Sequence, residues 1–473
     1  VDSFISNHRA VLGVIRARGG DSSTRSGSAG TVYVEVAGSE RYLAISNGHL
    51  ASKTSILTTY PSELDEVELE EFYISESAHV HVGSSLDVHA QSILVLGEST
   101  LLTSAGSVLS LTANHVNVTA GLISCTGTGG TIVVNSTSDP LLVGGEVTAS
   151  SIVLIGTNDM TFDAGTTLAA SSTIVLKSAH DVMLGSGCKF TAGSTIELTE
   201  AYDVTLGSGT VFTAPTIDFI RVHDILVGSD SVFTASTIML NSTQDVSLGS
   251  DVTLGSGAAS SIVVIDGAND LTLGSGAVVK ASTIVLEGAN DVTLGSGTVL
   301  DASALGFAEA TGSGAGGSPT YVGSSSSCYN YPDHRYASGS GGGHAGNGAQ
   351  GAYVAVYYCF TNDYPAGGAS YGDAMNPWML GSGGGKAYVG GSSLASGYGG
   401  SGGGRVRVSA GAALTLEAGV EITASGGAGL SSGNAGGGGG SGGSVQLMAR
   451  FLYASSSASL FTKGGAGGNG AGS

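Results

Sequence analysis

The chain has 473 residues, of which 80 are glycine and only 11% are charged, while 41% are hydrophobic. This composition excludes a disordered chain, which pairs low hydrophobicity with high charge, and a helical protein, because glycine and β-branched residues replace the strong helix formers. The formal net charge of −21 disfavours nucleic acid and anionic membranes as partners, and no apolar run of about 20 residues is present to span a bilayer.

Residues 1–70 are predicted to form an N-terminal glycine-rich strand unit followed by an acidic connection. The run TVYVEV at 31–36 alternates as a strand does. The acidic residues are expected to be solvated; they are Glu63, Asp65, Glu66, Glu68, Glu70 and Glu71. The first residue is Val1, which favours a mature or excised piece of a longer precursor.

Residues 71–305 carry an internal repeat. DVMLGSG at 181–187 returns as DVTLGSG at 203–209, with a TIxL run before each copy and a run such as VFTA after it. From Asp159 onward, the repeated aspartates are spaced by 22, 22, 21, 21, 25 and 21 residues. Each run alternates with period two, which indicates strands. We therefore predict an all-β fold: a single right-handed parallel β-helix with three strands per rung of about 22 residues and glycine-rich turns and insertions.

The same frame extends upstream to about residue 70, which gives about ten rungs by residue 302. Residues 72–90 align without gaps on 284–302, and this alignment puts His79 at the position of Asp291. One inner face is predicted to contain Val204, Val246 and Val292.

The repeated aspartates form one column at a corner of the predicted helix. Asx side chains in turns hydrogen-bond nearby backbone N–H groups, and we favour this role. The alternative is Ca²⁺ binding by stacked carboxylates, for which the candidates are Asp181, Asp203, Asp224 and Asp245. No metal site and no cofactor are predicted.

An outward column beside the aspartates is rich in threonine, namely Thr161, Thr205, Thr272 and Thr293. Such an array can be ordinary strand-forming threonine, an O-glycan site or an ice-binding surface. Three N-glycosylation sequons begin at Asn117, Asn135 and Asn241, and we expect at least one of them to be occupied.

Catalysis finds little support in the sequence. Glu197 and Asp218 are neighbouring outward carboxylates, and such a pair suits acid–base chemistry. Only Arg221 is available to join them on that face. We therefore predict no catalytic residues and no enzyme.

Residues 306–473 are predicted to continue the β-helix, with the glycine tracts as tight turns and insertions. A Tyr/Gly/Cys insertion spans 321–398 and holds eleven of the 17 tyrosines. Its aromatic residues suit contacts with sugars or with each other. Cys328 and Cys359 flank part of this insertion and are predicted to form a disulfide. Cys125 and Cys188 lie too many rungs apart to be bridged and are expected to be separate thiols.

Four glycine-rich motifs follow one another in this half: SGGGHAGNGAQG (340–351), ASYGDAMNPWMLGSGGG (369–385), SGGGRVRV (401–408) and GGGGGSGGSVQL (436–447). In this order they resemble the glycine-rich segments of very large eukaryotic surface proteins of land plants and protists. The resemblance covers about 310–473 only. It implies a β-solenoid at the cell surface and no established catalytic residues.

These observations favour a structural extracellular glycoprotein, a rigid β-helical rod that assembles head-to-tail with copies of itself into a filament. The opening segment 13–36 resembles 419–449, so Thr31–Val36 of one copy is expected to supply the strand after the final glycine tract of another. Internal cut points of a longer covalent solenoid would explain the same similarity. The second hypothesis is a β-helix that binds or processes carbohydrate at 321–398, and the third is ice binding.

Overall fold

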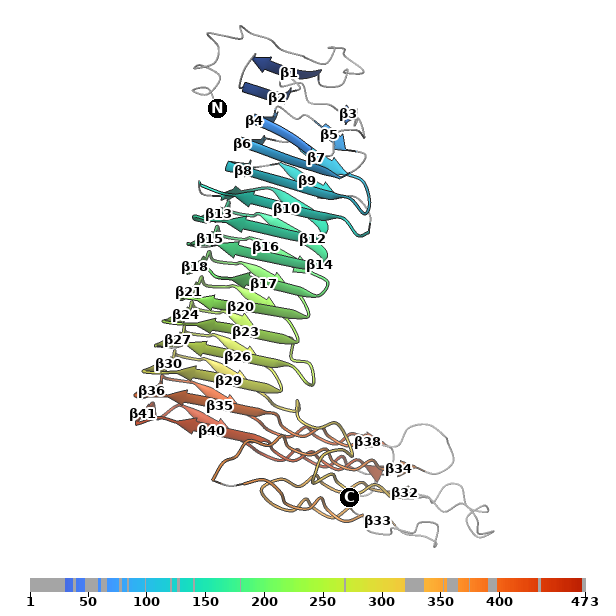
Figure 1. Ribbon diagram of the computed structural model, residues 1–473. Helices are drawn as coiled ribbons and strands as arrows, with labels where there is room; N and C mark the ends of the chain where they lie inside the picture. The colour runs from blue at the N-terminus through green and yellow to red at the C-terminus, as the bar shows by residue number, and fades with distance from the viewer. Residues whose placement is uncertain are drawn as a thin grey trace, which may run out of the picture. The chain divides into compact units, whose positions relative to one another are not determined.

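The computed structural model describes residues 30–36, 40–46, 58–60, 66–75, 79–82, 85–97, 99–119, 121–125, 128–138, 141–178, 180–267, 269–319, 336–351, 353–354, 365–373, 375–389, 398–432 and 435–469. Over these residues the chain is all-β without helix, and parallel strands stack as a β-solenoid of about ten turns with about 22-residue spacing (Figure 1). The predicted fold class is confirmed, while its handedness stays a prediction. The chain divides into two compact units, Val1–Ser231 and Val232–Ser473.

In the first unit each turn adds strands to three parallel stacks, A, B and C. Stack A contains β10 (Thr131–Ser136), β17 (Thr195–Thr199) and β20 (Thr216–Val222). Stack B contains β2 (Glu40–Ser46), β11 (Leu141–Val143), β13 (Met160–Phe162), β15 (Val182–Leu184), β18 (Asp203–Leu206) and β21 (Asp224–Val227). Stack C contains β3 (Thr58–Tyr60), β5 (His79–Val82), β7 (Thr100–Thr103), β9 (Leu122–Cys125), β16 (Lys189–Ala192) and β19 (Val211–Thr213).

Five longer strands of this unit turn a corner and contribute to two stacks. Stacks A and B share β4 (Glu66–Ser75), β6 (Leu86–Leu96) and β8 (Val108–Thr119). Stacks C and A share β12 (Glu146–Gly156) and β14 (Thr167–Ser178). An additional strand, β1 (Gly30–Val36), pairs antiparallel with β2. Thr31–Val36 therefore pairs with a strand of its own chain, and pairing with another copy remains a prediction.

The second unit has the same three stacks. Stack A contains β23 (Thr237–Ser242), β26 (Ile262–Gly267), β29 (Thr283–Gly288), β35 (Arg405–Ala410) and β40 (Ser444–Met448). Stack B contains β24 (Val246–Leu248), β27 (Leu271–Leu273), β30 (Val292–Leu294), β36 (Ala413–Leu416) and β41 (Phe451–Ala454). Stack C contains β22 (Val232–Thr234), β25 (Thr253–Leu254), β28 (Val278–Lys280), β31 (Val299–Asp301), β37 (Glu421–Thr423) and β42 (Ser459–Phe461).

The period-two alternation places every second side chain inside the coil. There it packs against the side chains at the same position in the preceding and following turns. The predicted inner positions Val204, Val246 and Val292 are all buried. In stack C of the first unit the inner residues include Phe190 and Phe212, whose rings lie 5.1 Å apart edge to face. These stacked apolar side chains form the core, which continues through the length of each unit.

The upstream alignment on the later repeat is wrong by one strand. Val80, next to His79, pairs in register with Leu101, and that stack continues through Leu168 to Phe190. His79 therefore begins a stack C strand and not the stack B strand that follows each repeated aspartate. All three strands of a turn alternate with the same period, so a shift of one strand leaves the apolar pattern intact.

The acidic run is also placed differently from the prediction. Residues 66–71 belong to β4, which pairs parallel with both β2 and β6. This part of the run is a paired strand of the sheet and not a connection. Alternation of glutamate with Val67 and Leu69 carries the strand signal, which the charge of the run obscured.

Within the second unit, a glycine-rich segment leaves the three stacks after β31 and returns at β35, which pairs directly with β29. This segment covers 302–404 and so includes the predicted insertion 321–398, but the glycine tracts are not tight turns. They lie side by side and hydrogen-bond to one another, and we call them the glycine bundle: 312–317, 339–343, 381–385, 399–404, 424–430, 436–443 and 464–468. Two small antiparallel sheets accompany them, β32 (Tyr336–Ala337) with β33 (Tyr353–Val354) and β34 (Tyr388–Val389), and β38 (Ser431–Ser432) with β39 (Ala435–Gly436).

Tract 436–443 is fully buried and shows how the bundle is built. The N–H groups of Gly437, Gly440 and Gly443 donate to tract 424–430. Those of Gly438 and Ser441 donate to tract 381–385. Every third residue of the tract therefore hydrogen-bonds to the same neighbouring tract. Three residues per turn is the repeat of a polyproline II helix, which has no internal hydrogen bonds. Only glycine lets the tracts approach this closely.

Candidate functional site

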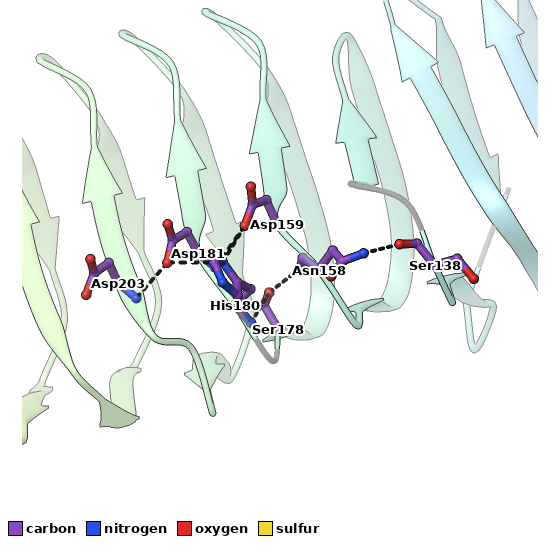
Figure 2. Close-up of polar contacts among 7 residues, drawn as sticks. All are labelled: Ser138, Asn158, Asp159, Ser178, His180, Asp181 and Asp203. Carbon is purple, nitrogen blue, oxygen red and sulfur yellow. Dashed lines mark hydrogen bonds and ion pairs between the residues drawn. The ribbon is translucent and has the colours of Figure 1, made fainter.

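The repeated aspartates begin the stack B strands and link consecutive turns of the solenoid. In the first unit, Oδ1 of Asp159 accepts a hydrogen bond from the backbone N–H of Asp181 at 3.4 Å, and Oδ1 of Asp181 accepts one from Asp203 at 3.3 Å (Figure 2). In the second unit, Asp270 accepts from Asp291 at 3.1 Å. The side chains therefore cap N–H groups as predicted, but those of the next turn and not of their own.

The residues just before the aspartates form a second ladder. Where this residue is asparagine, its amide donates to the previous turn: Nδ2 of Asn269 lies 3.0 Å from Oδ1 of Asp245, and Asn158 donates to the carbonyl of Ser138 (Figure 2). Where it is histidine, Nδ1 takes the place of the amide, as His180 does 2.7 Å from Oδ1 of Asp159.

Each of these histidines lies between two aspartates from consecutive turns. His180 is 2.7 Å from Asp159 and 3.6 Å from Asp181 (Figure 2). His223 occupies the equivalent place, 3.4 Å from both Asp203 and Asp224. In each cluster the three candidate ligand atoms lie within 4.8 Å of one another. We call these the His180 cluster (Asp159, His180, Asp181) and the His223 cluster (Asp203, His223, Asp224).

Tyr202 separates the two clusters. Its ring stacks on His223 with centroids 4.3 Å apart and an interplanar angle of 12°, and on His180 at 6.3 Å and 29°. The tyrosine is 52% exposed, so the three rings form a short ladder open to solvent. The sequence alone showed the residue types but not this stacking, because it depends on the register between turns.

The carboxylate pair Glu197 and Asp218 is brought together as expected, in register on β17 and β20. Burial, and then the charge of Glu197, raise the pKa of Asp218. Arg221 does not join them, because its guanidinium pairs with Glu200 at 2.8 Å. Arg221 therefore does not act as a cationic partner of the carboxylate pair.

The predicted outward threonines lie on the outer side of stack B. Thr161 and Thr205 are in register with Met183 between them, and Leu226 follows. Both apolar residues are exposed, so they interrupt the threonine surface. Thr272 and Thr293 are in register on β27 and β30 of the second unit. Their roles in ice or O-glycan binding stay predictions.

The three sequon asparagines lie within strands. Asn117 and Asn135 are half-buried in β8 and β10, whereas Asn241 is exposed in β23. Asn241 is therefore the most accessible candidate for a glycan.

Cys125 and Cys188 are free and buried, as predicted. Burial raises the pKa of both thiols. Cys328 and Cys359 lie outside the described residues, so their disulfide stays a prediction, as does sugar binding by the segment 321–398, which is described only in part. Within that part, Trp378 packs against Arg405, whose guanidinium carbon lies 4.4 Å from the ring centroid.

The last described coil of the second unit, β40–β42, exposes side chains that are buried in the preceding coil. Leu452 pairs in register with Leu414, and Leu460 with Ile422. Leu414 and Ile422 are 0% exposed, whereas Leu452 is 55% and Leu460 is 47% exposed. We call this surface the apolar coil face. Its sequence differs little from the buried coil, so only the structure identifies it.

The described part of the chain contains no helix that is long and apolar enough to cross a membrane. Comparison of the sequence and the structure with known proteins finds no matching family model, no similar curated protein and no similar solved structure.

Proposed function

We propose that this chain is a structural protein of an extracellular surface, and that its solenoid associates end to end with a second copy into a fibre. The observation that carries the proposal is the apolar coil face. Leu452 and Leu460 occupy core positions of the β-solenoid, yet about half of each side chain is exposed. A core position that no described coil covers gains free energy when another coil stacks on it.

Burial of the exposed half of each leucine adds to association. Full burial of an exposed leucine side chain contributes about 1.5–3 kcal/mol. Leu452 and Leu460 are already about half buried, so the two together offer about 1.5–3 kcal/mol. Phe451 and Tyr453 are more than half exposed, but they alternate with Leu452 and occupy outer positions of the strand. Pairing of the edge strands must therefore supply most of the free energy that offsets the cost of association, about 4–15 kcal/mol.

Edge strands favour a second copy as the occupant. Among the described residues, strands β40, β41 and β42 are each paired on one side only, and so are β1 and β3. A strand edge without a partner offers its backbone groups to another chain. A contact between these unlike edges is heterologous, so it continues as a fibre without closing. Because β1 lies on stack B and runs antiparallel to β2, its junction with the stack B strand β41 is antiparallel, unlike the ladder within each unit.

Sedimentation velocity over a range of concentrations tests the proposal. We expect concentration-dependent oligomers of the wild type, and their loss in the double variant Leu452→Glu/Leu460→Glu. The matched control is Leu226→Glu, because Leu226 is 50% exposed on the side of the solenoid. A wild type that stays monomeric, or a control variant that dissociates as fully as the double variant, would refute end-to-end association.

A further inference from the structure

We infer that the His223 cluster, and with it the His180 cluster, binds a divalent transition-metal ion of the Zn²⁺ class. This inference is independent of the fibre proposal, because both clusters lie on the side of the first unit. Each cluster provides one imidazole nitrogen and two carboxylate oxygens, from three residues on two consecutive turns.

The two nitrogen–oxygen distances in the His223 cluster are those of ligands around a tetrahedral ion. Zinc lies about 2.0–2.2 Å from nitrogen and oxygen ligands, and tetrahedral angles then put the ligand atoms about 3.3–3.6 Å apart. Nδ1 of His223 lies 3.4 Å from Oδ1 of Asp203 and 3.4 Å from Oδ2 of Asp224. Both nitrogen–oxygen separations match this value without any movement.

Asp203 supplies a second, independent observation. Its Oδ1 atom is buried and has no hydrogen-bond partner among the described residues, and it faces the imidazole of His223. A buried carboxylate oxygen is costly unless it is hydrogen-bonded or close to a cation. A metal ion between Asp203, His223 and Asp224 satisfies this oxygen directly.

The His180 cluster needs a small adjustment before it fits the same ion. Nδ1 of His180 is 2.7 Å from Asp159, the length of a direct hydrogen bond, and 3.6 Å from Asp181. The His180 side chain is 59% exposed, so a small rotation of its ring can bring both distances close to those of the His223 cluster. We therefore expect the His180 cluster to bind the metal more weakly than the His223 cluster.

The donor set favours transition metals over Ca²⁺. Calcium takes six to eight oxygen ligands, whereas imidazole suits zinc, copper and nickel. Side chains of the His223 cluster are between 33% and 41% exposed, so water completes the coordination. Calcium binding by the aspartate column alone, the alternative considered from the sequence, leaves the histidines without a role.

The column itself supplies the test variants. Asparagine occupies the histidine position at Asn269 and Asn290 and preserves the ladder there. His180→Asn and His223→Asn are therefore expected to fold normally. In the converse variant, Asn269→His, the new imidazole lies between Asp245 and Asp270 and reproduces the cluster on another turn.

Isothermal titration of the untagged protein with ZnCl₂ and with CaCl₂ measures stoichiometry and affinity. We expect His223→Asn to lose the tighter zinc equivalent, the double variant His180→Asn/His223→Asn to lose two, and Asn269→His to gain one. Each lost site corresponds to an affinity drop of at least about tenfold. Unchanged zinc stoichiometry in the double variant would overturn the inference. So would calcium binding as tight as zinc binding that both histidine variants retain.

Discussion

Glycine is required at the centre of the glycine bundle, and Gly440→Ala tests this directly. A Cβ atom on Gly440 would lie 2.0 Å from the carbonyl oxygen of Ser401 and 2.4 Å from its carbon. Ordinary contacts begin near 3.4 Å, so tracts 436–443 and 399–404 must move apart by more than 1 Å. Overpacking of this kind costs about 1–3 kcal/mol.

The same displacement strains two hydrogen bonds of the mutated residue. Gly440 donates to Gly427 at 2.9 Å and accepts from Gly465 at 2.8 Å, and each buried hydrogen bond contributes about 1 kcal/mol. We therefore expect Gly440→Ala to reduce the free energy of unfolding of the second unit by about 3–5 kcal/mol.

Gly464→Ala is the matched control, because the nearest atom to its Cβ is the oxygen of Gly440 at 3.6 Å. This change is expected to be neutral or to stabilise by about 0.4–1 kcal/mol, since alanine restricts the unfolded chain. Urea unfolding gives the free energies, and amide hydrogen exchange shows whether protection is lost in 424–443. Equal stability of the two variants would refute close packing of the tracts.

Three further predictions concern the solenoid. Phe190→Ala removes a buried ring that contacts Phe162 and Phe212 and should cost about 3–5 kcal/mol by urea unfolding, whereas a loss below 1 kcal/mol would contradict the packed core. Asp218→Asn should raise the melting temperature at pH 7 and have no effect near pH 3. The raised pKa of Asp218 means that its contribution to stability is complete below the ordinary value of 3.8 and is lost as the pH rises through the folded value; destabilisation at pH 7 would contradict this sign. Asp270→Ala removes the acceptor for the Asp291 N–H and should cost about 1 kcal/mol, and full retention of amide protection at Asp291 would argue against the ladder.

Much of the solenoid could be predicted because two independent sequence patterns indicate the repeat: the apolar alternation and the recurring aspartate. Burial of Val204, Val246 and Val292 follows from the alternation. The alternation does not distinguish the three strands of one turn, so the alignment of 72–90 on 284–302 puts His79 in the wrong stack. Charge in residues 66–71 concealed a strand for a related reason, because the acidic residues outweigh the alternation of Val67 and Leu69.

The glycine bundle and the histidine clusters could not be predicted, because both depend on contacts between distant turns. Gly438 and Gly385 are hydrogen-bonded at 2.9 Å although more than 50 residues separate them, and no local pattern specifies this pairing. Likewise, His223 and Asp203 are 20 residues apart, and only the register of consecutive turns places them 3.4 Å from each other. The apolar coil face differs from the buried coils in that no further described coil stacks on it.

The most direct test of the structural role is electron microscopy of the concentrated, untagged protein, followed by X-ray diffraction of aligned material. The account predicts unbranched fibres with a meridional reflection near 4.8 Å, because strands stacked end to end run across the fibre axis. Leu452→Glu/Leu460→Glu should give only single particles. Monodisperse single particles of the wild type at every concentration would contradict the proposed fibre.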